Sequence, residues 1–233
     1  MQEEDSEREW TPVKLEAFSE QMAHALGSRL SALVLYGSAA RASDAPSQRA
    51  AMNTLLIVAG DAVSDDLFVQ LSGPVRSWVA SGHPPPIIMT EREWRDSTDA
   101  FPIEYDDIRA GHRVLAGRDP WHGIAVQRAD VRRQLEHELM GKLVHLRQAY
   151  AANWNRPKRL ADVIRETRAG FLTMLRAVLR LAGRTPPADA GALVHDAGAL
   201  IGFGADGLAE PAAYLDAVTR TAQYVNRMER NVS

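Results

Sequence analysis

The stretch from Leu33 to Gly60 reads LVLYGSAARASDAPSQRAAMNTLLIVAG and decides the fold. It begins with an apolar run, Leu33 to Tyr36, whose length suits a buried strand. Gly37-Ser38 follows at once, and a short segment with Arg41 and several turn-forming residues comes next. A second apolar run, Leu55 to Val58, closes the stretch. This order predicts two strands joined through a Gly-Ser turn at a helix start, a turn that lets a phosphate approach the backbone closely.

Tyr36-Gly37-Ser38, with Arg41 soon after, resembles the nucleotidyltransferases of the DNA polymerase beta superfamily. In that family the next strand carries two carboxylates, at positions i and i+2. The resemblance places Ala51 and Asn53 at these two positions of the present chain. A register shifted by one residue places Met52 and Thr54 there instead, and neither register supplies a carboxylate.

The resemblance implies a reaction that joins a nucleotide to an acceptor hydroxyl, with two Mg²⁺ ions holding the triphosphate. Mg²⁺ is a hard cation that prefers anionic oxygen ligands. Ala51 offers no ligand and Asn53 offers one neutral oxygen, so we expect poor metal affinity. Mg²⁺ and a nucleoside triphosphate are therefore expected as cofactors only if the chain is active.

The composition excludes several classes of protein. The chain has 233 residues, of which 45% are hydrophobic, enough for a sizeable core. It has no cysteine, so a disulfide, a thiolate metal site and a cysteine nucleophile are excluded. The seven histidines show no HxH or HxxxH spacing. No apolar run approaches the roughly 18 residues that span a bilayer, and the acidic start has no signal-peptide core. We expect a cytoplasmic protein without a membrane role, bacterial by its Ala- and Arg-rich bias.

Charge is divided unevenly along the chain. Residues 1–120 carry 11 Lys and Arg against 19 Asp and Glu, whereas residues 121–233 carry 16 against 11. Complementary domain surfaces or scattered charged helix faces would account for this difference, and a basic half that faces a phosphate-bearing ligand is the sharper alternative. No run interleaves aromatic and basic residues, so no dedicated nucleic-acid surface is expected.

Residues 1–120 predict an α/β domain, a small mixed sheet with flanking helices, like a nucleotidyltransferase fold. A first helix is expected from Thr11-Pro12 to Gly27. Ile87-Ile88-Met89 predicts a further strand. The helix that opens near Asp61 is expected to be kinked or interrupted at Gly73-Pro74. Thr90 and Glu93 have the spacing of a capping box.

Residues 121–233 predict an all-α antiparallel helical bundle. Apolar residues recur at spacings of three and four from Val131 to Tyr150, as on an amphipathic helix. Three further helices with short connections follow. Kanamycin-type nucleotidyltransferases similarly place a helical domain after the nucleotide domain. We place the boundary between the two domains near Pro120.

The residues expected to bind a nucleotide or another phosphate group are Gly37, Ser38 and Arg41. Ser38 would donate its hydroxyl and backbone N–H, and Arg41 would offer its forked guanidinium. A plain tight turn and a surface ion pair to Asp44 are the alternatives.

Asp107, beside Asp106, is a candidate for a relocated metal site, although acidic residues also favour helix starts. Glu136, with Glu138, is a candidate general base, because the resembled antibiotic-modifying enzymes use a glutamate of their helical domain. Both candidates have an ordinary alternative, an exposed acid on a helix.

The sequence therefore predicts a nucleotidyltransferase-like protein that has lost catalysis and binds a nucleotide or phosphate ligand or a protein partner. A homodimer is one form of that partnership. The alternative is an active nucleotidyltransferase that uses a relocated acid and transfers a nucleoside monophosphate to a small-molecule or protein hydroxyl.

Overall fold

The computed structural model describes residues 14–41, 51–204 and 208–228. Its contacts divide these residues into two compact units. The first unit contains the described residues of 14–96 together with 111–124, and the second contains 97–110 together with the described residues after 124. The fold class is the expected one, a small mixed sheet with flanking helices and a separate helical unit.

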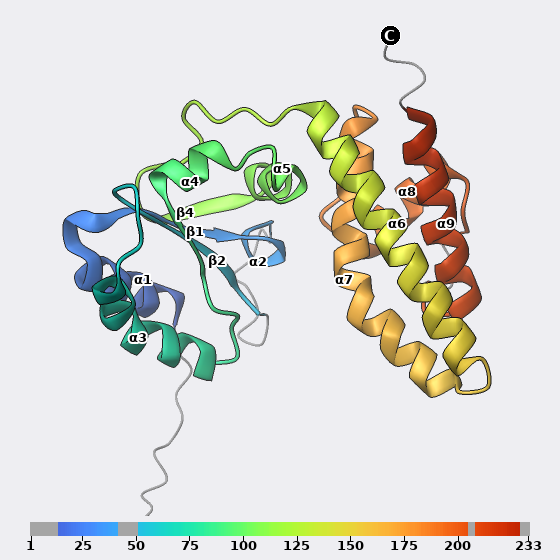
Figure 1. Cartoon of the computed structure of the whole chain (residues 1–233), viewed down its shortest axis with the longest axis horizontal. Helices are drawn as coiled ribbons and strands as arrows, with labels where there is room; N and C mark the ends of the chain where they lie inside the picture. The colour runs from blue at the N-terminus through green and yellow to red at the C-terminus, as the bar shows by residue number, and fades with distance from the viewer. Residues whose placement is uncertain (1–13, 42–50, 205–207, 229–233) are drawn as a thin grey trace, which may run out of the picture. The chain divides into compact units, whose positions relative to one another are not determined.

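A four-stranded sheet forms the centre of the first unit (Figure 1). Its strand order is β3-β2-β1-β4, where β1 is Leu30–Tyr36, β2 is Asn53–Val58, β3 is Ile87–Thr90 and β4 is His112–Gly117. β1 lies antiparallel to both β2 and β4, whereas β3 is parallel to β2. The apolar runs of the deciding stretch thus lie in the two central strands, and the residues of these runs from Leu33 to Leu35 and from Leu55 to Val58 are buried.

Two helices cover one face of this sheet, α1 (Leu15–Leu26) and α3 (Asp65–Ala80) (Figure 1). Phe18 of α1 stacks on Trp78 of α3 with ring centroids 4.2 Å apart, and both rings are fully buried. A short 3-10 turn, Gly27–Arg29, connects α1 to β1. The expected cap at Thr11-Pro12 lies outside the described residues.

The helix was expected to be kinked or interrupted at Gly73-Pro74, and of these two outcomes the interruption was wrong, because α3 is one continuous helix that contains Pro74. A proline removes a single hydrogen bond from a helix. Leu67 and Leu71 before it and Trp78 after it are all buried in the same core. Packing on both sides of Pro74 therefore keeps the helix continuous.

The capping box is confirmed at the start of α4 (Glu91–Asp96). The backbone N–H of Thr90 donates to Glu93 Oε2 at 2.8 Å, and the N–H of Glu93 donates to Thr90 Oγ1 at 3.1 Å. This reciprocal pair satisfies two donors that a helix start otherwise leaves unpaired. The cap sets the direction in which α4 leaves β3.

The second unit consists of helices, and the amphipathic pattern predicted after Val131 is confirmed there. These helices are α5 (Pro102–Ala110), α6 (Arg128–Asn153), α7 (Pro157–Leu181), α8 (Ala190–Ile201) and α9 (Pro211–Met228). α6 and α7 form a helical hairpin (Figure 1). Their common core includes Leu135, Leu139 and Phe171, all with no exposed surface. None of the helices in the described residues combines the length and apolar character needed to cross a bilayer.

Helix α5 packs with the second unit although it precedes β4 in the chain. Ile103 of α5 belongs to the same core as α6 and α7. The chain therefore leaves the first unit after residue 96, returns at residue 111 and leaves again after residue 124. The sequence pattern that predicts a boundary near Pro120 does not predict this excursion of residues 97–110.

Candidate functional site

The Gly-Ser turn follows β1 directly. Gly37 has a φ of 83°, a left-handed conformation that residues with a side chain rarely adopt. Its carbonyl accepts hydrogen bonds from the N–H groups of Ala40 and Arg41, each at 3.2 Å, and these bonds begin α2 (Ser38–Arg41). The Ser38 side chain is exposed. Because α2 is one turn long, it contributes little dipole, so the positive charge of this site comes from side chains.

Asn53 lies against Gly37. The two strands are paired so that Tyr36 is opposite Asn53, and a Cβ added to Gly37 would stand 3.2 Å from Asn53 Nδ2. Met52 points into the core under α1 and α3, and Thr54 is also buried. Ala51 is exposed just before β2. Asn53, rather than Met52 or Thr54, is therefore the β2 residue beside the turn.

The Arg41 side chain lies beside the chain segment that enters β4. A Cβ added to Gly111 would overlap Arg41 Cγ and stand 3.0 Å from its Cδ. Arg41 is half-buried, so its aliphatic part is held against the backbone at Gly111. Glycine at position 111 is thus what lets the arginine pass so close to the sheet.

Three side chains share the face of the sheet at this end. Tyr36 is opposite Asn53 on β2 and opposite His112 on β4, and residues opposite each other in antiparallel strands point to the same face. His112 Nε2 lies 3.7 Å from Asp119 Oδ2, and the ring lies 5.8 Å from that of Trp121. The site thus offers a phenol, an amide and an imidazole beside Gly37.

A buried histidine fixes the chain just before Asn53. His83 Nδ1 accepts a hydrogen bond from the backbone N–H of Met52 at 3.3 Å, and the imidazole packs on Trp78 with centroids 4.0 Å apart. Burial lowers the pKa of His83 below its ordinary value, which favours the neutral ring that can accept this bond. Sequence reasoning missed this residue, because its position before three prolines suggests only an exposed turn.

The residues beside Gly37 do not suit the Mg²⁺ ions that the family resemblance implies. Magnesium sites in proteins use one or two carboxylates, and Asn53 supplies only an amide while Ala51 supplies no donor. Within the described residues, no three His, Asp or Glu side chains gather closely enough to hold a metal ion. Asp44 lies outside the described residues.

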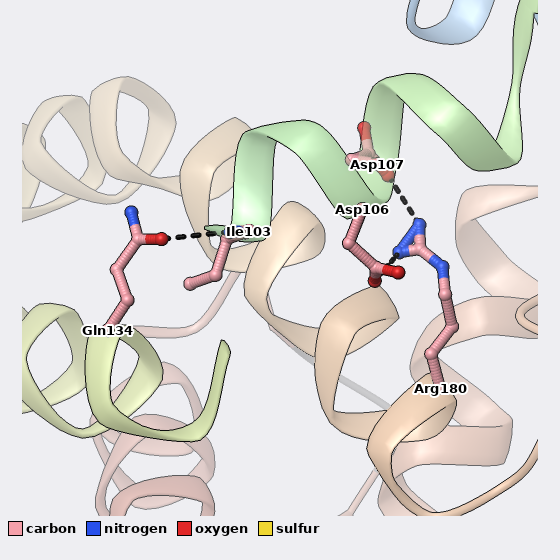
Figure 2. Close-up of polar contacts among 5 residues, drawn as sticks. All are labelled: Ile103, Asp106, Asp107, Gln134 and Arg180. Atoms are coloured by element: carbon pink, nitrogen blue, oxygen red, sulfur yellow. Dashed lines mark hydrogen bonds and ion pairs between the residues drawn. The ribbon is translucent and has the colours of Figure 1, made fainter. Parts of the chain in front are cut away.

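The acidic pair of α5 is engaged by an arginine of α7 (Figure 2). Arg180 donates from Nη1 to Asp106 at 3.1 Å and from Nη2 to Asp107 at 2.8 Å. Burial raises the pKa of Asp106, and Arg180 opposes that rise. Figure 2 also shows Gln134 of α6 accepting a hydrogen bond from the N–H of Ile103 at 2.9 Å. Both acids therefore attach α5 to the helical unit.

The candidate base on α6 is also paired. Glu136 Oε2 accepts a hydrogen bond from Arg132 Nη1 at 3.0 Å, one turn earlier on the same helix. Glu138 is exposed. The structure thus places the two catalytic candidates, Asp107 and Glu136, in ion pairs of the helical unit, and it brings Gly37, Asn53, Ser38 and Arg41 together in the first unit.

No family model and no curated protein matches this chain. Among solved structures, the chain is similar to a spectinomycin adenyltransferase from Enterococcus faecialis, whose crystal structure holds ATP and spectinomycin. The sequence identity is 15%, the match covers 89% of this chain and 97% of that chain, and the TM-score is 0.48. Similarity at this level leaves the function to be argued from the residues themselves.

Proposed function

We propose that this chain is a nucleotidyltransferase-like protein that binds a nucleotide, or another small molecule with a phosphate group, at the Gly37 turn without transferring a nucleotide. One observation carries the proposal: the amide of Asn53 lies against Gly37, 3.2 Å from the point where a side chain would begin. The fold that the sequence resembles would have a carboxylate here.

An amide and a carboxylate act differently on a phosphate. A carboxylate repels a phosphate unless a metal ion lies between them, whereas an amide N–H can donate directly to a phosphate oxygen. Ser38 adds an exposed hydroxyl and Arg41 adds a planar guanidinium that can hold two phosphate oxygens. This donor set binds an anion without Mg²⁺.

The alternative of an active transferase with a relocated acid receives no support from the described contacts. Asp107 and Glu136 accept hydrogen bonds from Arg180 and Arg132, respectively. A carboxylate that is already paired is a poor metal ligand, since the metal must displace a bound cation.

Titration calorimetry with ATP, in Mg²⁺ and again in EDTA, tests the proposal. We expect the two dissociation constants to agree within about threefold, because no bridging metal is needed, and we expect no pyrophosphate release. The variant Arg41→Gln should weaken binding by about tenfold, the effect of one charge-assisted hydrogen bond.

Arg76→Gln is the matched control, since Arg76 is exposed on α3 and donates to the carbonyl of Ser72 in its own helix. It should bind ATP like the parent protein. Binding that requires Mg²⁺, or pyrophosphate release from any of the four nucleoside triphosphates, would refute the proposal.

A further inference from the structure

A cavity lies at the opposite end of the sheet from the Gly37 turn. Its volume is about 450 Å³, and its walls include Ser31, Ile57, Glu91, Trp94, Arg95 and Arg118. Ser31 precedes Gly37 by six residues of extended chain, which corresponds to about 20 Å at 3.3 Å per residue. The cavity lining contains none of Gly37, Ser38, Arg41 and Asn53, although its wall residue Asp119 lies 3.7 Å from His112. The volume of the cavity suits a small organic molecule.

The floor of this cavity is apolar and firmly held. Ile57, Trp94 and Ile124 line it and are at most 8% exposed. The indole N–H of Trp94 donates to the carbonyl of Pro120 at 3.0 Å, and the Trp121 ring packs edge-on at 5.1 Å. Because the only polar atom of the Trp94 side chain is already bonded, the residue offers apolar surface to a ligand.

The acceptor groups around the cavity are occupied by partners within the chain. Glu91 Oε1 accepts hydrogen bonds from the Ser31 hydroxyl and from Arg118. The Ser31 hydroxyl, and then Arg118, hold the pKa of Glu91 below its ordinary value. Asp119 accepts from the N–H of Trp121 at 2.9 Å. Neither carboxylate needs a donor from a ligand.

The donor groups retain capacity. Arg95 is exposed on the cavity wall and forms no ion pair within the part of the chain that the structure describes. Arg118 is bonded to Glu91 through Nη2 and has further N–H groups to offer. Its backbone is fixed, because its own N–H donates to the carbonyl of Ser31 at 2.9 Å. The wall therefore presents two arginines toward an acceptor.

We propose that this cavity binds a small organic carboxylate with a planar apolar body, the body lying on Trp94 and Ile57 and the carboxylate meeting Arg95 and Arg118. A carboxylate matches the planar fork of a guanidinium, whereas a neutral hydroxyl engages it through one weaker bond. The inference is independent of the proposed phosphate site, because it uses neither Gly37 nor Arg41.

Saturation-transfer NMR with the full chain and indole-3-acetate tests this proposal. A ligand of this size that gains about 0.3 kcal/mol per non-hydrogen atom has a dissociation constant of about 1 mM, so we expect that affinity or tighter. The neutral alcohol indole-3-ethanol should bind about tenfold more weakly, because it loses the charge-assisted bonds.

Two variants locate the binding. Arg95→Gln should weaken the binding of indole-3-acetate by about tenfold and the binding of the neutral alcohol by less than about threefold. Arg92→Gln is the matched control on the same helix. Arg92 is exposed, its Nε forms an ion pair with Asp96 Oδ2 at 3.6 Å, and it does not line the cavity. It should bind like the parent protein. The proposal would be overturned if the acid and the alcohol bound with equal affinity, or if indole-3-acetate at about 10 mM gave no saturation-transfer signal. It would also be overturned if Arg95→Gln and Arg92→Gln lost the same affinity for indole-3-acetate.

Discussion

The Gly37 turn and helix α5 differ in whether carboxylates stand where the sequence suggests a metal or phosphate site. Beside Gly37 the described β2 residue is Asn53, whose side chain is an amide and not a carboxylate. On α5 two carboxylates stand next to each other, yet both are bonded to Arg180 (Figure 2). The difference teaches that a pair of acids in a sequence indicates a metal site only if its oxygens are unclaimed in the fold.

The largest effect expected from this comparison is on stability when Arg180 is replaced. Asp107 is 8% exposed, so Arg180→Met leaves a buried carboxylate without its cation and should lower the free energy of unfolding by about 3 kcal/mol in urea denaturation. The difference in unfolding free energy between this variant and the parent protein should shrink as the pH falls. Without the guanidinium, burial raises the pKa of Asp106 further, and a raised pKa favours the folded state at low pH.

Arg165→Met is the control for this variant, since Arg165 pairs with Asp162 on the exposed side of α7. Arg165→Met should lower the free energy of unfolding by less than about 1 kcal/mol. If the Arg180 variant were equally mild, the acids of α5 would not be structural and would return as metal-site candidates.

The next effect concerns the contact between Gly37 and Asn53. Gly37→Ala combines a φ of 83° with a methyl group 3.2 Å from the Asn53 amide, and should cost about 2 kcal/mol of unfolding free energy. Adding Asn53→Ala to this variant should restore only the part of the lost unfolding free energy that comes from the contact between the new methyl group and the Asn53 amide. Gly141→Ala, in the interior of α6 with no atom beyond its own helix backbone within 4 Å of the added methyl and no proline after it, should instead stabilise by about 0.5 kcal/mol.

A third variant places carboxylates near the Gly37 turn, where the protein has Ala51 and the amide of Asn53. The double change Ala51→Asp and Asn53→Asp should tighten Mg²⁺ binding by about tenfold, because two carboxylates two residues apart at the start of β2 can supply anionic ligands to one ion. Calorimetric titration with Mg²⁺ measures this effect. The single variant Thr54→Asp is no substitute, because its side chain points into the core. Unchanged Mg²⁺ affinity would mean that positions 51 and 53 are not the family's carboxylate positions.

The smallest effect is the pH dependence that His83 contributes near the turn. Its pKa is lowered in the folded state, so the unfolded state binds the proton first, and stability is lost as the pH falls from about 6.5 through the folded pKa. The slope from this residue cannot exceed about 1.4 kcal/mol per pH unit. Urea denaturation of His83→Gln across this range should show a correspondingly flatter profile, and an identical profile would contradict this role.

Much of the fold could be predicted from the sequence, because the evidence was local. The apolar runs around Gly37 became β1 and β2, and the spacing of apolar residues from Val131 became the buried side of α6. The continuity of α3 through Pro74 could not be predicted, since it depends on packing against α1.

The site was predictable only in part, for the same reason. The family resemblance was enough to propose Ala51 and Asn53 as the residues near the turn, with Met52 and Thr54 as the alternative register. The partner of Asp107 is 73 residues away in the chain, and no local pattern indicates that Arg180 reaches it. Ser31 and Arg118 are likewise brought together by the pairing of β1 with β4, so the cavity between them has no sequence motif.

The excursion of α5 has a practical consequence for anyone who divides this protein. A fragment that stops at residue 120 keeps α5 but removes the helices that shelter Ile103 and neutralise Asp107. Such a fragment would expose the apolar face of α5 and an unpaired Asp107 carboxylate to water, and it would be prone to aggregate. Because the chain crosses between the units three times, no single scission yields either half intact.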